Sequence, residues 1–193
     1  MVAKIKLGFV PTRRSVFSAP DALKYRDLTA ARLTELGIDF VDIKDINPEG
    51  LLFSDEDVAK IADKFRREKV DGIILAHCNF GTEYVCARLA KQLGLPVLLW
   101  GPLDERPLPD GRRLRDTQCG LFATGKVLRR FQVKVTDSTN CRLSDPVFER
   151  AGQFTAHAVV QKKSSGSSSS KKKSSSKQKS SSKKKSSSKK QVG

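Results

Sequence analysis

Short apolar segments alternate with helix-length segments through residues 5–131, and this alternation restricts the fold more than any other feature of the chain. The apolar segments are residues 5–10, 38–43, 72–75 and 96–100, and Val133 and Val135 allow a fifth. Strands joined through helices run parallel, with right-handed crossovers that cover both faces of the sheet. The sequence therefore predicts an α/β fold, a Rossmann-like open parallel sheet of four to five strands with helices on both faces.

The helices are predicted from capping residues and apolar periodicity. Ser54 is expected to cap the second helix, with Asp57 at the reciprocal position of a capping box. The apolar positions that follow have the i, i+3, i+4, i+7 spacing of a buried helix face: Val58, Ile61, Ala62 and Phe65. We also expect helices from Pro20 to Gly37, from Thr82 to Gly94, and from Asp116 or Thr117 to Phe131.

Residues 70–94 read as strand, loop and helix in one run. A polar and aromatic loop, residues 77–81, follows the strand directly. In open α/β sheets, ligands bind beyond the carboxyl ends of the strands. This loop is therefore the first candidate for a ligand-facing edge.

The positive charge of the chain is concentrated in its last part. Residues 162–190 contain 12 lysines and no acidic residue, which accounts for most of the net charge of +16. We expect a globular domain over residues 1–150, an irregular linker over 151–161, and a disordered Lys/Ser-rich tail over 162–193. Without aromatic residues or arginines, that tail would bind nucleic acid or anionic surfaces only weakly and without specificity.

The remaining composition indicates a soluble protein of a reducing compartment. The four cysteines are scattered and the chain has two histidines, so zinc spacing is absent. No segment has the length of a membrane span, and the N-terminus does not have the pattern of a signal peptide. A cytoplasmic location and no membrane span are the resulting expectations.

The segment after the first strand excludes the common phosphate-binding loops. It reads GFVPTRR, which matches neither G-x-G-x-x-G nor G-x-x-x-x-G-K-[ST]. Arg13 and Arg14 lie in this segment, on the same edge as residues 77–81, and forked guanidinium donors could bind a hydroxylated or anionic ligand. Solvated surface arginines are the competing interpretation.

The loop after the third strand supplies the other candidate binding residues. Asn79 and Phe80 could offer hydrogen bonds and a stacking face to a sugar, or could pack over the end of the sheet. His77 and Cys78 are adjacent on an extended segment and point to opposite faces, which disfavours a nucleophile–base pair. No catalytic set is predicted from spacing.

Several segments together resemble the first domain of the L-fucose/L-arabinose isomerase-like proteins, over roughly residues 4–150. They are KIKLGFVPTRR, the run from VDGIILAHCNFGTEY to GLFATGKVLRRF, and NCRLSDPVFER. The most specific part is LLWGP…LPDG…RDTQCGLFATGKVL. That domain is Rossmann-like in the family.

The resemblance implies an aldose–ketose isomerase lineage. Family members use a divalent metal, usually manganese, held by side chains of the second and third domains. The resemblance thus implies no metal bound by this chain, and substrate contacts lent to a neighbouring subunit of a homo-oligomer or of full-length isomerase subunits. An arginine of the family falls near Arg13 or Arg14, and a family aromatic falls at Cys78, so that stacking would come from Phe80.

Three functional hypotheses remain open at this point. The first is a truncated isomerase N-terminal region, inactive alone, whose substrate-binding residues are Arg13, Arg14, His77, Cys78, Asn79 and Phe80. The second is a stand-alone module that binds a small polyol or a partner protein. The third is non-specific nucleic-acid or anionic-surface binding through the cationic tail.

Overall fold

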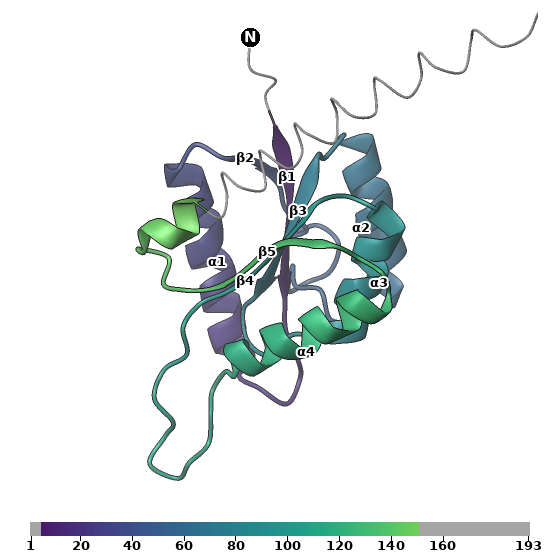
Figure 1. Cartoon of the computed structure of the whole chain (residues 1–193). Helices are drawn as coiled ribbons and strands as arrows, with labels where there is room; N and C mark the ends of the chain where they lie inside the picture. Colours follow the sequence, from purple (N-terminus) through teal and green to yellow (C-terminus); the bar gives the residue numbers. More distant parts are fainter. Residues whose placement is uncertain (1–4, 151–193) are drawn as a thin grey trace, which may run out of the picture.

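A computed structural model describes residues 5–150 as a single parallel sheet flanked by helices (Figure 1). The strands are β1 (Lys6–Thr12), β2 (Asp39–Val41), β3 (Gly72–His77), β4 (Val97–Gly101) and β5 (Val135–Asn140). The helices are α1 (Ala19–Glu35), α2 (Glu56–Arg67), α3 (Glu83–Leu93) and α4 (Thr117–Arg130). The predicted linker and Lys/Ser-rich tail lie outside the described residues.

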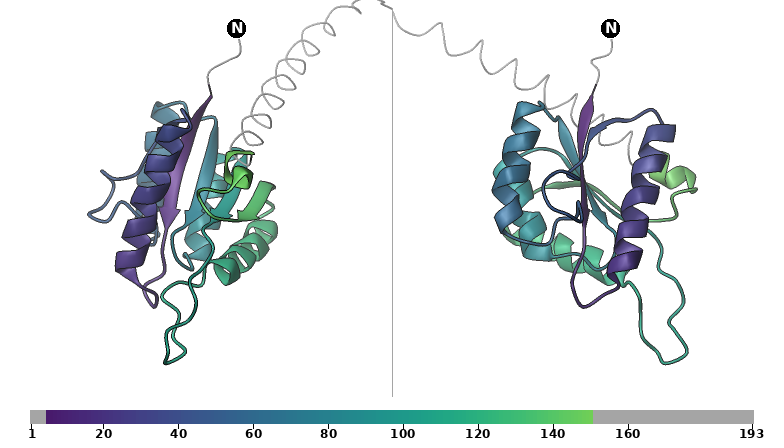
Figure 2. Two further views of the ribbon diagram at one scale, coloured as in Figure 1. Left: turned by 90° about the vertical axis from the view of Figure 1, so that its left-hand side faces the viewer. Right: turned by 180° about the vertical axis from the view of Figure 1, so that it is seen from behind.

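The strand order is β2-β1-β3-β4-β5, and every pair is parallel. Helix α1 covers one face, and α2, α3 and α4 cover the other (Figures 1 and 2). The predicted open parallel sheet with helices on both faces is confirmed, with five strands. Because the chain leaves β1 toward β2 and returns on the other side as β3, the carboxyl ends of β1 and β3 form the switch point at which such sheets bind ligands.

Alternation along the buried strands divides the core into two apolar layers. On β3, Ile73 and Leu75 pack against the α2, α3 and α4 side, whereas Ile74 and Ala76 pack on the α1 side. Successive side chains of a strand point to opposite faces, so a continuous apolar run fills both layers. All four apolar positions predicted for α2 are buried: Val58, Ile61, Ala62 and Phe65.

Strand β1 continues through Pro11, where the sequence suggested that it ends. The Pro11 carbonyl accepts a hydrogen bond from the Leu52 amide at 2.8 Å, and Thr12 pairs with Leu52 as an isolated bridge. Strand β2 is only three residues long and has already ended at this level. Proline is tolerated because the amide proton it lacks would face this sparsely paired side of the strand.

The caps of two helices differ from the sequence-based expectation. Asp55 occupies the N-cap position of α2, and Asp57 does not form the expected capping box. The buried Asp57 carboxylate instead accepts from the Asn47 side-chain amide at 2.8 Å. Helix α4 starts after Asp116 as expected, but its first amides are bound by Asp104 from the preceding loop, at 2.9 and 3.3 Å. At α4 a residue distant in sequence thus replaces the local cap, whereas at α2 the Ser54 hydroxyl still accepts from the Glu56 amide at 3.4 Å.

The described part of the chain contains no helix that is both long enough and apolar enough to cross a membrane.

Candidate functional site

The candidate site lies at the switch point, where the loops after β1 and β3 meet. Asn79 joins these loops with a fully buried side chain. Its Oδ1 accepts hydrogen bonds from the amides of Arg14 (2.8 Å) and Gly81 (3.2 Å), and its Nδ2 donates to the carbonyls of Arg14 and Ser18, both at 3.3 Å. Asn79 therefore fixes the shape of the site and is not accessible to a ligand in this structure.

Arg14 and Phe80 form the solvent-facing part of the site. The Arg14 guanidinium lies 4.9 Å from the centre of the Phe80 ring and pairs with Glu83 at 3.2 Å. Phe80 in turn stacks on Phe17, with ring centres 5.4 Å apart and planes 6° from parallel. The Arg14 side chain is 39% exposed, so this cation and the two rings are the groups that a ligand could reach.

Arg13 is directed away from Arg14. Its Nε and Nη2 donate to the Glu49 carboxylate, the latter at 2.8 Å, and its guanidinium lies 4.0 Å from the centre of the Phe53 ring. The side chain is 11% exposed. The two adjacent arginines therefore contact different parts of the molecule, and Arg13 joins the loop after β1 to the segment before α2.

His77 is completely buried at the end of β3. Its Nδ1 lies 2.7 Å from the Phe80 carbonyl oxygen, an acceptor, so this nitrogen carries the proton. Among the described residues, Nε2 has no hydrogen-bond partner. Loss of hydration on burial lowers the pKa of His77 to about 4, which keeps the ring neutral at physiological pH.

Cys78 lies on the opposite side of the strand, in a small apolar cluster with Ala22 and Leu51. Burial raises the pKa of its thiol to about 12. A thiol with this pKa is neutral at pH 7 and is a poor nucleophile. His77 and Cys78 therefore do not combine into a catalytic pair. Substrate binding by the six residues named in the sequence analysis stays a prediction, and Arg14 and Phe80 are the two of them best placed to contact a ligand.

Sequence reasoning missed a second polar network, centred on Arg115. The Arg115 side chain is fully buried, donates to Glu105 at 3.0 Å and to the Leu103 carbonyl at 2.6 Å, and lies 3.8 Å from the centre of the Tyr25 ring. Glu105 also accepts from the Tyr25 hydroxyl at 2.9 Å. Nothing in the local sequence GRRLR distinguishes Arg115 from its neighbours.

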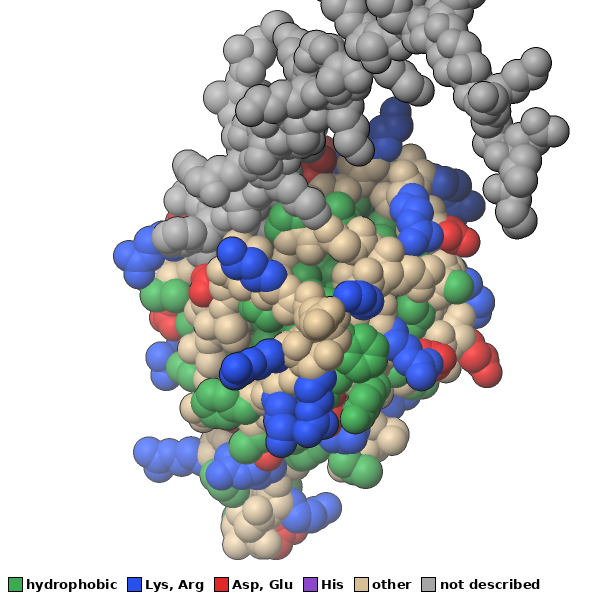
Figure 3. All heavy atoms as spheres, turned by 45° about the vertical axis from the view of Figure 1, so that its right-hand side comes forward, with side chains coloured by type: hydrophobic (Ala, Val, Ile, Leu, Met, Phe, Trp, Pro, Cys, Tyr) green, Lys and Arg blue, Asp and Glu red, His purple; other side chains and the backbone are tan. Residues whose placement is uncertain are grey.

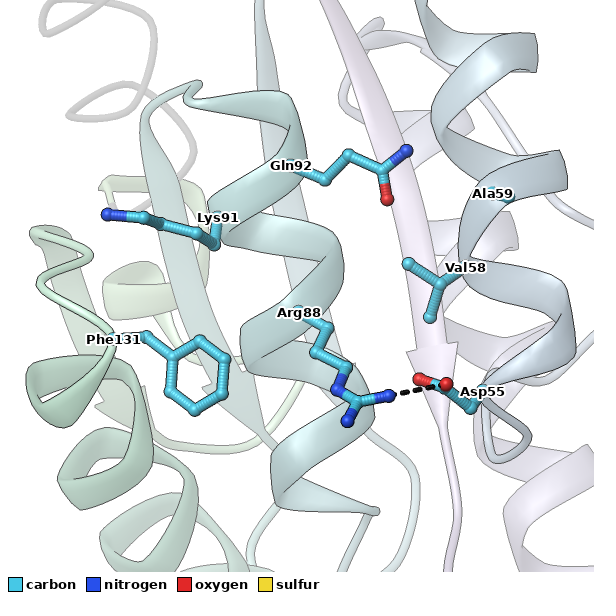
Figure 4. A pocket seen from close by; sticks show the side chains of 7 residues that line it. All are labelled: Asp55, Val58, Ala59, Arg88, Lys91, Gln92 and Phe131. Atoms are coloured by element: carbon cyan, nitrogen blue, oxygen red, sulfur yellow. Dashed lines mark hydrogen bonds and ion pairs between the residues drawn. The ribbon is translucent and has the colours of Figure 1, made fainter.

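The surface of the described residues contains hollows away from the switch point. One of about 440 Å³ and one of about 330 Å³ flank residues 103–105, beyond the carboxyl ends of β4 and β5. Another, of about 400 Å³, lies on the helical face between α2 and α3, where Arg88 pairs with Asp55 (Figure 4). Figure 3 shows Lys and Arg side chains spread over this helical side of the molecule. At the switch point itself, Asn79, His77 and Cys78 are buried.

A manganese site needs several oxygen or nitrogen ligands close together. Across residues 5–150, no group of three or more His, Cys, Asp and Glu side chains is placed to hold a metal ion. The donor set that manganese would need is therefore not met by the described part of the chain.

Among solved structures, the chain is similar to an ABC transporter solute binding protein from Bacillus halodurans C-125 with bound myo-inositol. The two share 9% identity and a TM-score of 0.34, over 73% of this chain and 58% of that chain. A likeness at this level supports no functional argument. No curated protein matches the chain.

A family model gives the decisive comparison. The model of the fucose/sulfoquinovose isomerase N-terminal domain matches residues 8–163, which include β1 from Gly8 onward and every later helix and strand of the structure. The match spans most of the chain and agrees with the parallel α/β architecture and with the resemblance read from the sequence. The chain belongs to the family of fucose/sulfoquinovose isomerase N-terminal domains.

Proposed function

We propose that this chain forms one side of the sugar-binding site in an aldose–ketose isomerase and is inactive on its own. The observation that carries the proposal is the partly exposed group formed by Arg14, Phe80 and Phe17 at the switch point. A guanidinium can donate to sugar hydroxyls, and an aromatic ring can pack against the apolar face of a sugar. Manganese and the proton-transfer groups would then come from other domains of the isomerase, in the same or a neighbouring subunit.

The rigidity of the loops favours this role. Asn79 holds the Arg14 backbone through two hydrogen bonds, and Thr82 donates to the Arg13 carbonyl at 2.8 Å. A ligand that binds Arg14 and Phe80 therefore orders little additional backbone, which lowers the entropic cost of binding.

The buried residues argue against chemistry by this loop alone. His77 is neutral and shielded from solvent, and Cys78 is a buried thiol of high pKa. Neither is placed to move a proton between sugar carbons. The contribution that we assign to the loop is binding and orientation of substrate.

Two measurements test the proposal. Purified chain with manganese and L-fucose or L-arabinose is expected to give no ketose, and clear turnover would overturn the claim that it is inactive alone. In calorimetry with L-fucose, Arg14→Ala should weaken binding about tenfold, since a charge-assisted hydrogen bond is lost.

Arg112→Ala is the matched control, because Arg112 is an exposed arginine on the loop after β4 and pairs only with Asp110 among the described residues. Equal affinity of the Arg14→Ala and wild-type chains would remove Arg14 from the site.

A further inference from the structure

The hollow of about 400 Å³ on the helical side of the sheet combines an apolar floor with polar edges. It extends across α3, from Val58 and Ala59 of α2 to Phe131, the residue that ends α4 (Figure 4). The remaining lining residues are polar: Asp55, Arg88, Lys91 and Gln92. A hollow of this kind can take a large apolar side chain of a partner protein, the usual anchor of a protein interface.

The helices around the hollow are held together without a ligand. All three contribute to one apolar core layer on this side of the sheet. Arg88 of α3 pairs with Asp55 at the start of α2. On the other side of α3, the rings of Tyr84 and Phe131 meet edge to face, with centres 6.2 Å apart. The hollow is therefore formed in advance, which lowers the entropic cost of binding.

The surface around the hollow carries an excess of positive charge. In α3, α4 and the turn after α4, Glu83 is the one acidic residue, and it pairs with Arg14 at 3.2 Å. Helix α2 and its N-cap add no net charge, because four acidic residues are matched by four basic ones. The basic residues of α3, α4 and the following turn are all exposed: Arg88, Lys91, Lys126, Arg129, Arg130 and Lys134 (Figure 3).

Lys91 is the lining cation that is available to a ligand. Within residues 5–150, its ammonium group has neither a hydrogen bond nor an ion pair, whereas the Arg88 guanidinium is engaged by Asp55. In the same part of the chain, the side chain of Arg130, next to Phe131 in sequence, also has no anionic partner. Both ends of the apolar floor thus have a cation that can bind a carboxylate.

Three kinds of macromolecule could meet this surface. A nucleic acid would bring phosphates to the cations, but also to the Asp55 carboxylate and to an apolar floor that offers a phosphate no partner. A second copy of the chain carries the same excess of positive charge on this face and would be repelled. A protein segment can supply an apolar side chain and carboxylates together, and therefore matches both features.

We propose that this hollow is the docking site of an acidic segment of a partner protein, in which carboxylates flank one or two large apolar side chains. The apolar side chains fill the hollow over Val58 and Phe131, and the carboxylates pair with Lys91 and Arg130. The site lies away from the group at the switch point and does not depend on the function proposed above.

The test is a site-resolved NMR titration of the full chain with a synthetic peptide in which a Leu-Phe pair is flanked by Glu residues on both sides. Amide shifts are expected at residues 58–59, 88–92 and 131. A peptide with Ser-Ser in place of Leu-Phe should bind these residues about tenfold more weakly, because the apolar anchor is lost. This comparison cancels the attraction of both peptides to the 12 lysines of residues 162–190.

Two substitutions at lining residues address the hollow directly. Ala59→Tyr fills it and should weaken the binding of the Leu-Phe peptide about tenfold. Lys91→Met removes one ion pair and should weaken binding about fivefold. The matched controls are Ala31→Tyr and Lys24→Met, at exposed positions of α1 on the other face of the sheet, and both should leave the affinity unchanged.

Several outcomes would overturn the docking site. They are an absence of shifts at residues 58–59 and 88–92, equal affinities for the two peptides, and an affinity indifferent to Ala59→Tyr. Shifts of these amides by single-stranded DNA at lower concentration than by the peptide would assign the face to nucleic acid. Shifts on raising the chain concentration without peptide would assign it to a second copy. Arg14→Ala should leave the peptide affinity unchanged, so this proposal and the proposed function fail separately.

Discussion

Asn79 and Arg14 are joined by two hydrogen bonds, from the Arg14 amide to Asn79 Oδ1 at 2.8 Å and from Asn79 Nδ2 to the Arg14 carbonyl at 3.3 Å. A side-chain amide has the same donor and acceptor geometry as a peptide group, so Asn79 extends β-like pairing into two loops that lie 65 residues apart in sequence. The position of the Arg14 side chain at the sheet edge follows from this pairing.

Asn79→Ala is expected to lower the free energy of unfolding by about 2–3 kcal/mol, because buried backbone groups of both loops lose their partners. Urea denaturation monitored by circular dichroism measures the change. Gln118→Ala, at an exposed position in the first turn of α4, should change stability by less than about 0.5 kcal/mol. Equal midpoints for Asn79→Ala and wild type would show that the loops are held by other contacts.

Two glycines of α4 are expected to respond oppositely to alanine. A Cβ at position 120 would lie 2.0 Å from the Phe80 carbonyl oxygen, whereas one at position 125 would have only Leu99 Cδ2 nearby, at 4.0 Å. Gly120→Ala should therefore destabilise the chain by about 1–3 kcal/mol through overpacking. Gly125→Ala should stabilise it by up to about 1 kcal/mol, the difference in helix propensity. Thermal melts of the two variants give the sign directly.

Stability is expected to depend on pH through His77. Its pKa is about 4 in the folded chain against 6.5 for an unperturbed side chain, so between these values the unfolded state binds more protons. The free energy of unfolding therefore rises with pH across that window. The contribution of His77, about 3 kcal/mol in total, is lost as the pH falls from 6.5 toward 4.

Urea titrations at several pH values, on wild type and His77→Gln, isolate this contribution, because His157 is present in both proteins. A flatter pH dependence is expected for the variant. Parallel curves for the two proteins would contradict a buried neutral His77.

Replacing Arg115 should be among the most damaging changes in the loop after β4. Arg115→Met leaves Glu105, whose side chain is 43% exposed, without its cation and the Leu103 carbonyl without its donor, and a loss of about 1–3 kcal/mol is expected. Arg113→Met, two residues earlier and exposed, is the matched control. Similar unfolding midpoints for both variants would show that the network does not stabilise the fold.

The fold was predictable because the apolar patterns of its helices and strands agree with the burial found in the tertiary structure. The apolar spacing of α2 and the apolar run of β3 place their residues in the core as expected, and Gly94 ends α3 in the left-handed conformation, at a φ of 62°. Periods of 3.6 and 2 residues fix which side chains share a face before any long-range contact forms. For the strand order seen in the structure, the cover of both faces then follows from the handedness of crossovers.

The meeting of the two candidate loops was predictable, but the arrangement of their side chains was not. The sequence by itself determined that the loops after β1 and β3 share the carboxyl edge of the sheet, because that is a property of parallel strands. Only the tertiary structure decided that Arg13 turns toward Glu49, that His77, Cys78 and Asn79 are buried, and that Arg115 is buried while Arg113 is exposed. Those outcomes depend on partner residues tens of positions away in sequence, and local residue spacing does not show which of them lie close in space. A buried polar side chain is stable only where such partners form hydrogen bonds or ion pairs with it.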